Sequence, residues 1–377
     1  MEFGIFNGLY VPEAMTDAAG RRAEHRRLQE EVAWVKAADR AGFKYLWATE
    51  HHFLDEYSHL SANESFLGFC AAATERIHLG SGIFNITPPV NHPARIAERV
   101  AILDHLSEGR FEFGMGRGSS TTEQAGFGID DPDLTKEMFD EVVPEFRRMW
   151  AETDYSFDGR FFSMPPRNVL PKPFTDPHPP MWVAAGSPST FEKAARMGLG
   201  VLCFTTGPAA QLAPLIEAYK REIVNAEPVG EYVNDNVMVT SGMLCLDDGQ
   251  RARDALLATD DNRHKSLLFR YLDTFPRPPG IPTWPTLAPK MTASELEAAI
   301  QLGEFCIGDP DEVARAVQTY SDIGADQLTF GMLSSDLPID IALEATATFG
   351  REVLPRFDLD PVHRTTRQRE ANMGART

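Results

Sequence analysis

Cysteine is scarce in this sequence and follows no metal-binding or redox spacing. Only four cysteines occur among 377 residues, each alone in a mostly apolar segment: Cys70, Cys203, Cys245 and Cys306. Without a paired CxxC spacing, nothing indicates a zinc site or a dithiol redox centre. Isolated cysteines in apolar segments are typical of core residues in a reducing compartment, so we expect a cytoplasmic protein.

Long apolar runs and excess positive charge are also lacking. No apolar run approaches the 18 or so residues of a membrane span, and the chain begins directly with the strand-like "EFGIF" instead of a cleavable signal. Lys and Arg number 36 against 55 Asp and Glu, a formal net charge of −19. We therefore expect no membrane partner and no nucleic-acid partner, since binding to a phosphate backbone depends on positive charge.

The sequence does contain a regular alternation of short apolar segments and longer amphipathic ones. Eight segments have strand character: 2–7, 45–50, 77–84, 111–116, 181–185, 200–204, 237–246 and 327–332. Helical periodicity is found in 24–41, 62–75, 94–106, 135–150, 189–197, 209–225, from about 249, 293–302, 310–323 and 339–354. Short, almost continuously apolar strands are typical of a parallel sheet covered on both faces. Eight such units predict the α/β class and a single (β/α)8 TIM barrel.

A doubly wound parallel sheet is the main alternative to the barrel. Its nucleotide-binding fingerprint, GxGxxG, should follow the first strand. The approximate match "GMGRGSS" (114–120) follows the fourth strand and has no acidic residue at the required distance. We therefore favour the barrel.

Two proline-rich segments interrupt the alternation, 155–180 and 275–290. Proline fixes φ and lacks a backbone donor, so neither segment can be a central strand or helix. We expect insertions after strands 4 and 7 of a barrel domain spanning residues 1–357. The polar tail, 358–377, we expect to be frayed or to form an arm onto a partner subunit.

Glu50, His51 and His52 directly follow the second strand. Chemistry in such a barrel lies at the carboxyl ends of the strands. Adjacent residues of an extended chain point to opposite sides, so the two rings need different partners. Adjacent histidines are badly spaced for a metal site, and later strand ends offer no further ligands, so we expect no metal. One imidazole suffices for a general acid or hydrogen-bond donor, although a purely structural pair remains an alternative.

The fourth and fifth strand ends suit a phosphate monoester. "AAGSPST" (184–190) is a glycine turn that opens a helix, with Gly186, Ser187 and Thr190 at the helix start. Backbone N–H groups and the helix dipole favour an anion there. Arg117, after the fourth strand, could add a guanidinium. Because Ser187 could instead merely cap the helix, these residues alone leave both interpretations open.

Four segments in this order resemble the bacterial luciferase-like family of flavin-dependent monooxygenases. They are "EHHF" (50–53), "NHPARIAERVAILDHLSEGRFEFGMGRG" (91–118), "AAGSPSTFEKAARMG" (184–198) and "GDPDEVARAVQTYSDIGADQLTF" (308–330). The resemblance covers about residues 1–355. It implies a barrel, usually a homodimer, that binds reduced FMN supplied by a separate flavin reductase. It also implies that O₂ forms a flavin C4a-hydroperoxide that oxygenates an apolar small molecule, such as an aldehyde or ketone.

The resemblance also assigns roles to particular residues. It implies that Arg117, Ser187 and Thr190 bind the FMN phosphate beside Gly186. It places Phe84–Asn85 beside the flavin ring, where the family often has a non-prolyl cis peptide. Our catalytic candidates are His51, facing the flavin, and Glu50, with His52 turned away to join Glu50 in holding the loop. The segment 275–290 would be a lid on the substrate side.

The chain departs from the luciferase pattern at two positions. The family's reactive cysteine is Gly116 here, and an acidic residue near its phosphate site is Gly186, which argues against light emission more than against oxygenation. Two alternatives remain, a deazaflavin-dependent hydride-transfer oxidoreductase and a non-catalytic flavin-binding relative. The deazaflavin branch tends to have an Asp-His pair at the second strand end, whereas "EHHF" resembles the FMN branch.

Overall fold

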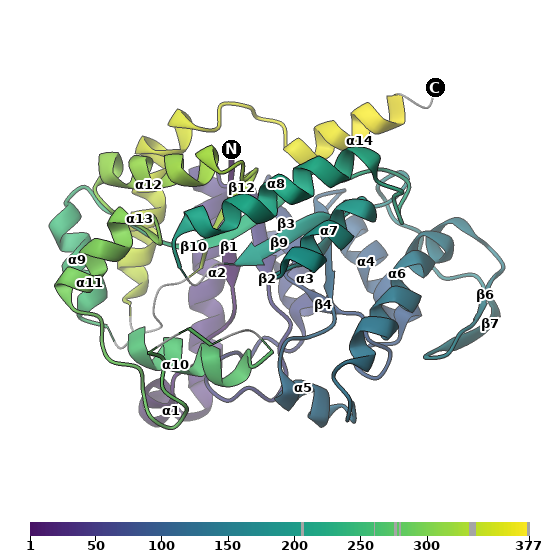
Figure 1. Cartoon of the computed structure of the whole chain (residues 1–377), viewed down its shortest axis with the longest axis horizontal. Helices are drawn as coiled ribbons and strands as arrows, with labels where there is room; N and C mark the ends of the chain where they lie inside the picture. The colour runs from purple at the N-terminus through teal and green to yellow at the C-terminus, as the bar shows by residue number, and fades with distance from the viewer. Residues whose placement is uncertain (205–206, 260, 275–276, 279, 332–336, 375–377) are drawn as a thin grey trace.

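Eight parallel strands form a closed barrel in the computed structural model, which describes residues 1–204, 207–259, 261–274, 277–278, 280–331 and 337–374 (Figure 1). In barrel order, the strands are β1 (Glu2–Asn7), β2 (Tyr45–Ala48), β3 (His78–Ser81), β5 (Phe111–Gly116), β8 (Met181–Ala184), β9 (Gly200–Phe204), β10 (Val237–Cys245) and β12 (Gln327–Gly331). The barrel closes because β12 pairs with both β10 and β1. The predicted TIM barrel is confirmed, and the doubly wound alternative is wrong.

Helices surround the barrel where amphipathic periodicity predicted them. They are α2 (Ala23–Ala41), α3 (Asn63–Ala73), α4 (Pro93–Leu106), α6 (Leu134–Ala151), α7 (Pro188–Arg196), α8 (Ala213–Glu222), α9 (Gly249–Leu257), α11 (Ala293–Gln301), α12 (Pro310–Asp322) and α13 (Ile339–Glu352). Local signals set their ends: Asp309 and Glu312 form a capping box at the start of α12, and Gly42 ends α2 at a φ of 92°.

Large aromatic side chains fill the barrel interior. Tyr45, Trp47 and Trp182 form a buried cluster with Leu202 and Met238. A Cβ atom added to Gly80 would lie only 2.2 Å from the ring of Trp47, so this strand position has room for glycine alone. The interior is therefore a packed core, and any site must lie at one of its ends.

Two strands differ from the sequence prediction. Residues Phe305–Gly308 form β11, which pairs with the second half of β10, where no strand was expected. The strand predicted over 77–84 is broken into β3 and the short β4 (Phe84–Asn85), which pairs with β5. The break contains a non-prolyl cis peptide between Gly82 and Ile83, so the position expected for it, Phe84–Asn85, is wrong by two residues.

Both proline-rich insertions contain secondary structure or pack on a neighbouring helix. The first includes the antiparallel hairpin of β6 (Tyr155–Asp158) and β7 (Ser163–Arg167). The second follows α10 (Asp261–Tyr271), and its residue Ala288 donates its backbone N–H to Ser266 of that helix at 2.8 Å. Three of its residues, 275, 276 and 279, lie outside the described part of the chain.

The tail forms a helix that packs on this chain's own barrel. Residues Arg364–Gly374 make α14, at the end of the molecule opposite to α1 (Glu13–Ala19), α5 (Thr121–Gly126) and α10 (Figure 1). Thr365 is buried and donates to Glu112 of β5 at 2.6 Å, and the backbone N–H of Arg364 donates to Glu2 at 2.8 Å. A frayed end is therefore wrong for these residues, and α14 closes the amino-terminal end of the barrel.

Candidate active site

Glu50 connects three segments at the carboxyl end of the barrel. Its buried carboxylate accepts a hydrogen bond from the Asn91 side-chain amide at 2.8 Å and one from the backbone N–H of Asn85 at 3.2 Å. The Nε2 atom of His52 lies 3.0 Å from the same carboxylate. Glu50 thereby ties the end of β2 to β4 and to the residues that precede α4.

The two histidines have different partners, as expected, although β2 ends at Ala48 and both lie in the loop beyond it. His52 pairs with Glu50, which confirms that expected contact, while the Nδ1 atom of His51 lies 3.3 Å from both carboxylate oxygens of Glu123. Glu123, on α5, also accepts the backbone N–H of His52 at 2.7 Å. This buried carboxylate fixes the His51 ring and leaves its Nε2 atom without a hydrogen-bond partner among the described residues.

Sequence reasoning missed Glu123. It lies six residues beyond Arg117, in a helix of only six residues that carries no apolar stripe. An acidic residue in that short helix was the available signal, but only folding shows that it reaches the second strand end.

Aromatic rings from α10 and the first two strand ends lie next to His51. The His51 and Tyr57 ring centroids are 5.6 Å apart, and His264 of α10 lies 5.9 Å from Tyr57 and 4.8 Å from Tyr10. Burial, reinforced by the positive charge of Arg27, lowers the pKa of His264 to about 4. His264 is therefore neutral near pH 7 and can offer one donor and one acceptor.

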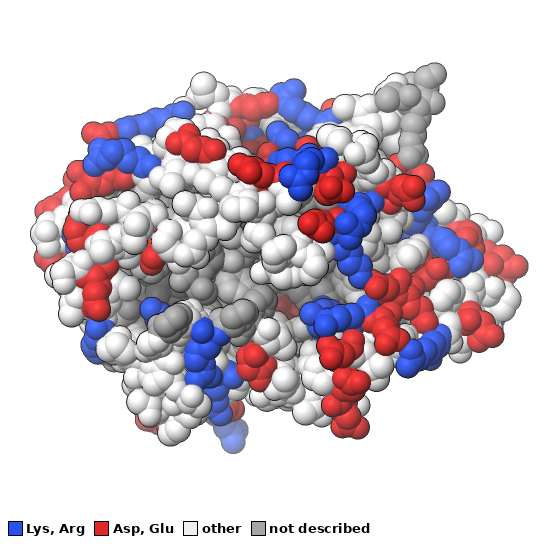
Figure 2. Space-filling model, viewed as in Figure 1, with Lys and Arg blue, Asp and Glu red and all other residues white. Residues whose placement is uncertain are grey.

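Polar contacts attach α10 to the loop that follows β2. The guanidinium of Arg263 donates to Glu56, and the hydroxyl of Tyr271 donates to Asp55 at 3.2 Å. Trp284, in the proline-rich segment, lies under Arg270, whose guanidinium carbon is 4.8 Å from the ring centroid. Figure 2 shows that the molecular face is hollowed between α7 and α10, beside this attachment.

Arg117 and Ser187 follow neighbouring strands of the barrel. Met115 of β5 pairs with Val183 of β8, so residues 117 and 187 lie just beyond adjacent strand ends. Ser187 caps α7 and accepts from the backbone N–H of Thr190 at 3.4 Å, and the two hydroxyl oxygens are 2.7 Å apart. Gly186 is exposed directly before this cap.

The guanidinium of Arg117 donates to the hydroxyl of Thr135 at 2.9 Å and is half-buried. Its hydrogen bond to Thr135 fixes the arginine at the edge of α6, beside α7. The hydroxyls of Ser187 and Thr190, a helix start and a half-buried guanidinium together suit the oxygens of a phosphate monoester.

Phe84 does not face this site. Its side chain is fully buried in the hydrophobic core, with its ring 6.2 Å from Phe111 and 6.3 Å from Phe113. The place beside the flavin that the resemblance implies for Phe84–Asn85 can therefore involve only the backbone of Phe84, which reaches the strand end. Asn85 is close to the site: its amide nitrogen would lie 3.0 Å from a Cβ atom on Gly118.

The described residues provide neither a metal site nor a membrane span. They contain no group of three or more His, Cys, Asp and Glu side chains arranged to hold a metal ion. None of their helices has the length and apolarity that crossing a membrane requires.

A profile of the family described as luciferase-like monooxygenase matches residues 1–327. The chain belongs to the luciferase-like monooxygenase family. Limonene 1,2-monooxygenase of Rhodococcus erythropolis is 26% identical over 96% of this chain and 87% of its own length. The crystal structure of the monooxygenase RslO1 from Streptomyces bottropensis is 26% identical, with a TM-score of 0.77 over 95% of this chain and all of that chain. This family member is therefore an enzyme of the luciferase-like flavin monooxygenase type.

Two other relatives match about half of this chain and about half of their own length. The oxygenase component of a flavin-dependent trigonelline monooxygenase from Acinetobacter baylyi is 28% identical over 50% of this chain and 51% of its own length. An F420-dependent glucose-6-phosphate dehydrogenase from Beutenbergia cavernae is 31% identical over 50% of this chain and 56% of its own length. Family members with a flavin and with F420 are thus both similar to this chain.

Proposed function

We propose that this enzyme binds reduced FMN from a separate flavin reductase and uses O₂ to oxygenate an apolar small molecule. The observation that carries the proposal is that Arg117 and the hydroxyl-rich start of α7 lie just beyond the ends of two adjacent strands. That arrangement fits an FMN phosphate. The trigonelline enzyme is named as an oxygenase component, which supports a separate reductase as partner here. Bound reduced FMN would supply the electrons that activate O₂.

His51 is the chain's own group for handling a proton in this reaction. Glu123 holds the ring through Nδ1, so the exposed side of the imidazole presents Nε2. A positioned imidazole can donate a proton to, or accept one from, a reacting oxygen. His52 and Glu50 hold the loop that carries His51.

The aromatic residues around α10 would exclude water from the reacting groups. Tyr10, Leu54, Leu267 and Tyr271 form a buried cluster, with Tyr57 and Trp284 packed against it. Water near activated oxygen favours loss of H₂O₂ over substrate oxygenation, so an apolar cover is a functional need. The segment 275–290, to which we assign the role of a lid, contributes Trp284 to this cover; its residues 275, 276 and 279 are outside the described chain.

A second copy of this chain is the proposed subunit partner. Phe69 of α3 and Leu106 of α4 are 57% and 58% exposed, and Ile102 lies one turn before Leu106 with 46% exposure. The two helices pack side by side, because a Cβ atom on Gly68 would lie 3.9 Å from Leu106. Adjacent exposed apolar side chains of this size favour burial against an identical face. Light scattering should show a dimer that Leu106→Glu dissociates.

F420-dependent hydride transfer is the second candidate function, because one relative is named as an F420-dependent dehydrogenase. The deciding experiment titrates the enzyme anaerobically with reduced FMN and with reduced F420, then adds O₂ and a panel of aldehydes, ketones and terpenes. We expect saturable binding of reduced FMN and oxygenated products. Binding of F420 alone, with substrate reduced or oxidised without incorporation of oxygen from ¹⁸O₂, would overturn the FMN proposal.

A further inference from the structure

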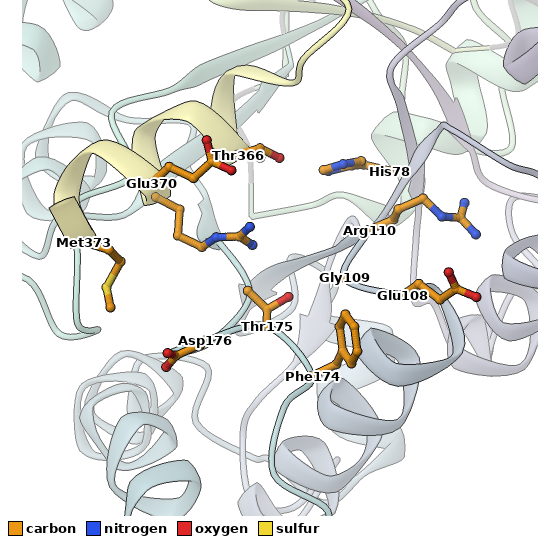
Figure 3. A pocket seen from close by; sticks show the side chains of 11 residues that line it. His78, Glu108, Gly109, Arg110, Phe174, Thr175, Asp176, Thr366, Glu370 and Met373 are labelled. Atoms are coloured by element: carbon orange, nitrogen blue, oxygen red, sulfur yellow. The ribbon is translucent and has the colours of Figure 1, made fainter.

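A second cavity lies at the opposite end of the barrel from the candidate active site. It has a volume of about 540 Å³ and lies, open to solvent, between α14 and the residues that precede β5 and β8. In Figure 3, His78 and Thr366 lie on one side of the cavity, and Phe174 and Asp176 lie on the other. None of the residues that we place in the flavin site lines it.

His78 provides a polar atom for this cavity. The residue is only 7% exposed, and its Nδ1 lies 2.8 Å from Glu112. Its ring stacks on His363, with 3.6 Å between the centroids. Within the described chain no hydrogen bond reaches the other ring nitrogen, Nε2, of this cavity-lining residue. A ring nitrogen that lines a cavity and has no protein partner can complete its hydrogen bonding with a ligand atom.

The proton on Nε2 depends on Glu112. Burial raises the pKa of Glu112 to about 8, so near pH 7 its carboxyl holds a proton. A protonated carboxyl can donate to Nδ1 of the neutral His78, which leaves Nε2–H as the donor on the cavity side. His78 therefore presents a hydrogen-bond donor to the cavity at neutral pH.

Two arginines line the cavity, and only one of them uses its guanidinium in hydrogen bonds to other residues. Arg110 donates to Ser107, Thr74, Ile77 and Ala71, and Figure 3 shows its guanidinium turned away from the cavity centre. Arg369 of α14 is half-buried and makes no hydrogen bond or ion pair with any residue of the described ranges. Its guanidinium is therefore available to a carboxylate.

The cavity rim carries negative charge, whereas the interior offers a positive charge and a hydrogen-bond donor. Glu108, Asp176 and Glu370 are all exposed residues of the rim. Phe174, which is 56% exposed, and the half-buried Met373 add an apolar surface. The cavity thus combines a free guanidinium and an imidazole donor inside, carboxylates outside and an apolar wall.

We propose that this cavity is a second binding site, for a small zwitterion of the amino-acid type with an apolar side chain. Its carboxylate would accept hydrogen bonds from Arg369 and from Nε2–H of His78. Its ammonium group would face the acidic rim, and its side chain would lie against Phe174 and Met373. Because the ligand touches both α14 and the barrel, its binding would stabilise the docked helix.

Three related probes test the proposal on the full-length enzyme by calorimetry and thermal unfolding. L-Phenylalanine carries both charges, 3-phenylpropionate only the carboxylate and phenethylamine only the ammonium group. We expect phenylalanine to bind tightest and to raise the unfolding temperature, phenylpropionate to bind more weakly and phenethylamine not to bind. Absence of phenylalanine binding at millimolar concentration, or tighter binding of the amine, would overturn the proposal.

A matched pair of substitutions on α14 locates the site. Arg369→Gln should weaken phenylalanine binding at least about tenfold, since it removes a charge-assisted contact. Arg367→Gln is the control, because Arg367 lies on the same helix, pairs with Asp360 and does not line the cavity. Equal affinity in the two variants, or displacement of phenylalanine by saturating FMN, would show that the ligand binds elsewhere.

Discussion

The two ends of the barrel bury the same kinds of side chain but differ in access. At the amino-terminal end, Glu112 accepts from Thr365 and Trp182 and contacts His78, and α14 closes over all of them. At the carboxyl end, loops and α10 cover the pairs of His51 with Glu123 and of His52 with Glu50. The first cluster lies under a docked helix and is reached from the cavity that His78 lines, whereas the molecular face is hollowed between α7 and α10 (Figure 2).

This difference shows what perturbed pKa values measure in this protein. Burial raises the pKa of Glu112 to about 8 and lowers those of His78 and His363 to about 3 and about 2. Strong perturbation often marks an active site. Here it occurs at both ends, since burial also lowers the pKa of His264 beside His51 to about 4, so perturbation reports burial, and access must be established separately.

Replacement of His51 by alanine should give the largest effect on product formation, and the same replacement of its neighbour His52 is the comparison. His51→Ala should lower product formation with reduced FMN about 10²–10⁴-fold, because it removes the positioned proton donor. His52→Ala should act mainly through stability, since His52 holds the loop through Glu50. Single-turnover product yield and urea unfolding of both variants separate the two roles. A larger catalytic loss in the His52 variant would show that the roles are reversed.

Removal of the guanidinium at the phosphate site should have the next largest effect. Arg117→Ala should weaken flavin affinity by about 1.5–3 kcal/mol, because charge-assisted contacts are lost. Arg147→Ala serves as a control, since Arg147 of α6 pairs with Glu231 and lies near His178, which precedes β8, away from the carboxyl ends of the strands. Equilibrium titration with FMN measures the change. If both variants bind FMN as the unaltered enzyme does, the phosphate lies elsewhere.

Glu123 should contribute less than His51, because it acts through the ring that it holds. Glu123→Gln keeps the shape and one acceptor oxygen but loses the negative charge, so we expect product formation to fall about tenfold. The pH dependence of the rate should also move, which a purely structural role would not cause. An unchanged pH profile together with an unchanged rate would remove Glu123 from the site.

Most of the barrel could be predicted from the sequence, and the reasons for the failures are physical. Apolar strands and amphipathic helices carry their periodicity locally, so the eight strands were found. The four residues of β11 are too short to be distinguished from a loop. The tail helix α14 has no apolar stripe; only Thr365 is buried, and polar contacts dock it.

The site was only partly predictable for a related reason. Strand alternation requires different partners for His51 and His52, and the structure shows them. Glu123 and His264 reach the site from segments distant in sequence, so no local pattern could place them there. Phe84 follows the correct strand, but its ring points into the core.

The smallest predicted effect tests the other end of the barrel through the pH dependence of stability. The raised pKa of Glu112 means that the folded state holds a proton between pH 4.5 and about 8 that the unfolded state releases. The unfolding free energy therefore falls as pH rises through this window, by about 1.4 kcal/mol per pH unit. His78 and His363 act oppositely, because only the unfolded state protonates them below pH 6.5.

Above pH 6.5 these two histidines therefore no longer offset the fall of the unfolding free energy with pH that Glu112 causes. Glu112→Gln replaces the protonated carboxyl with a neutral group of similar shape. The unfolding free energy of the unaltered protein should fall by about 2 kcal/mol between pH 6.5 and 8, and that of the variant should not. Urea unfolding of both proteins at several pH values measures this difference, and Glu108→Gln, on the exposed rim, should leave the slope unchanged. If Glu112→Gln keeps the full slope, then Glu112 is ionised under α14, and His78 presents an acceptor to the cavity instead of a donor.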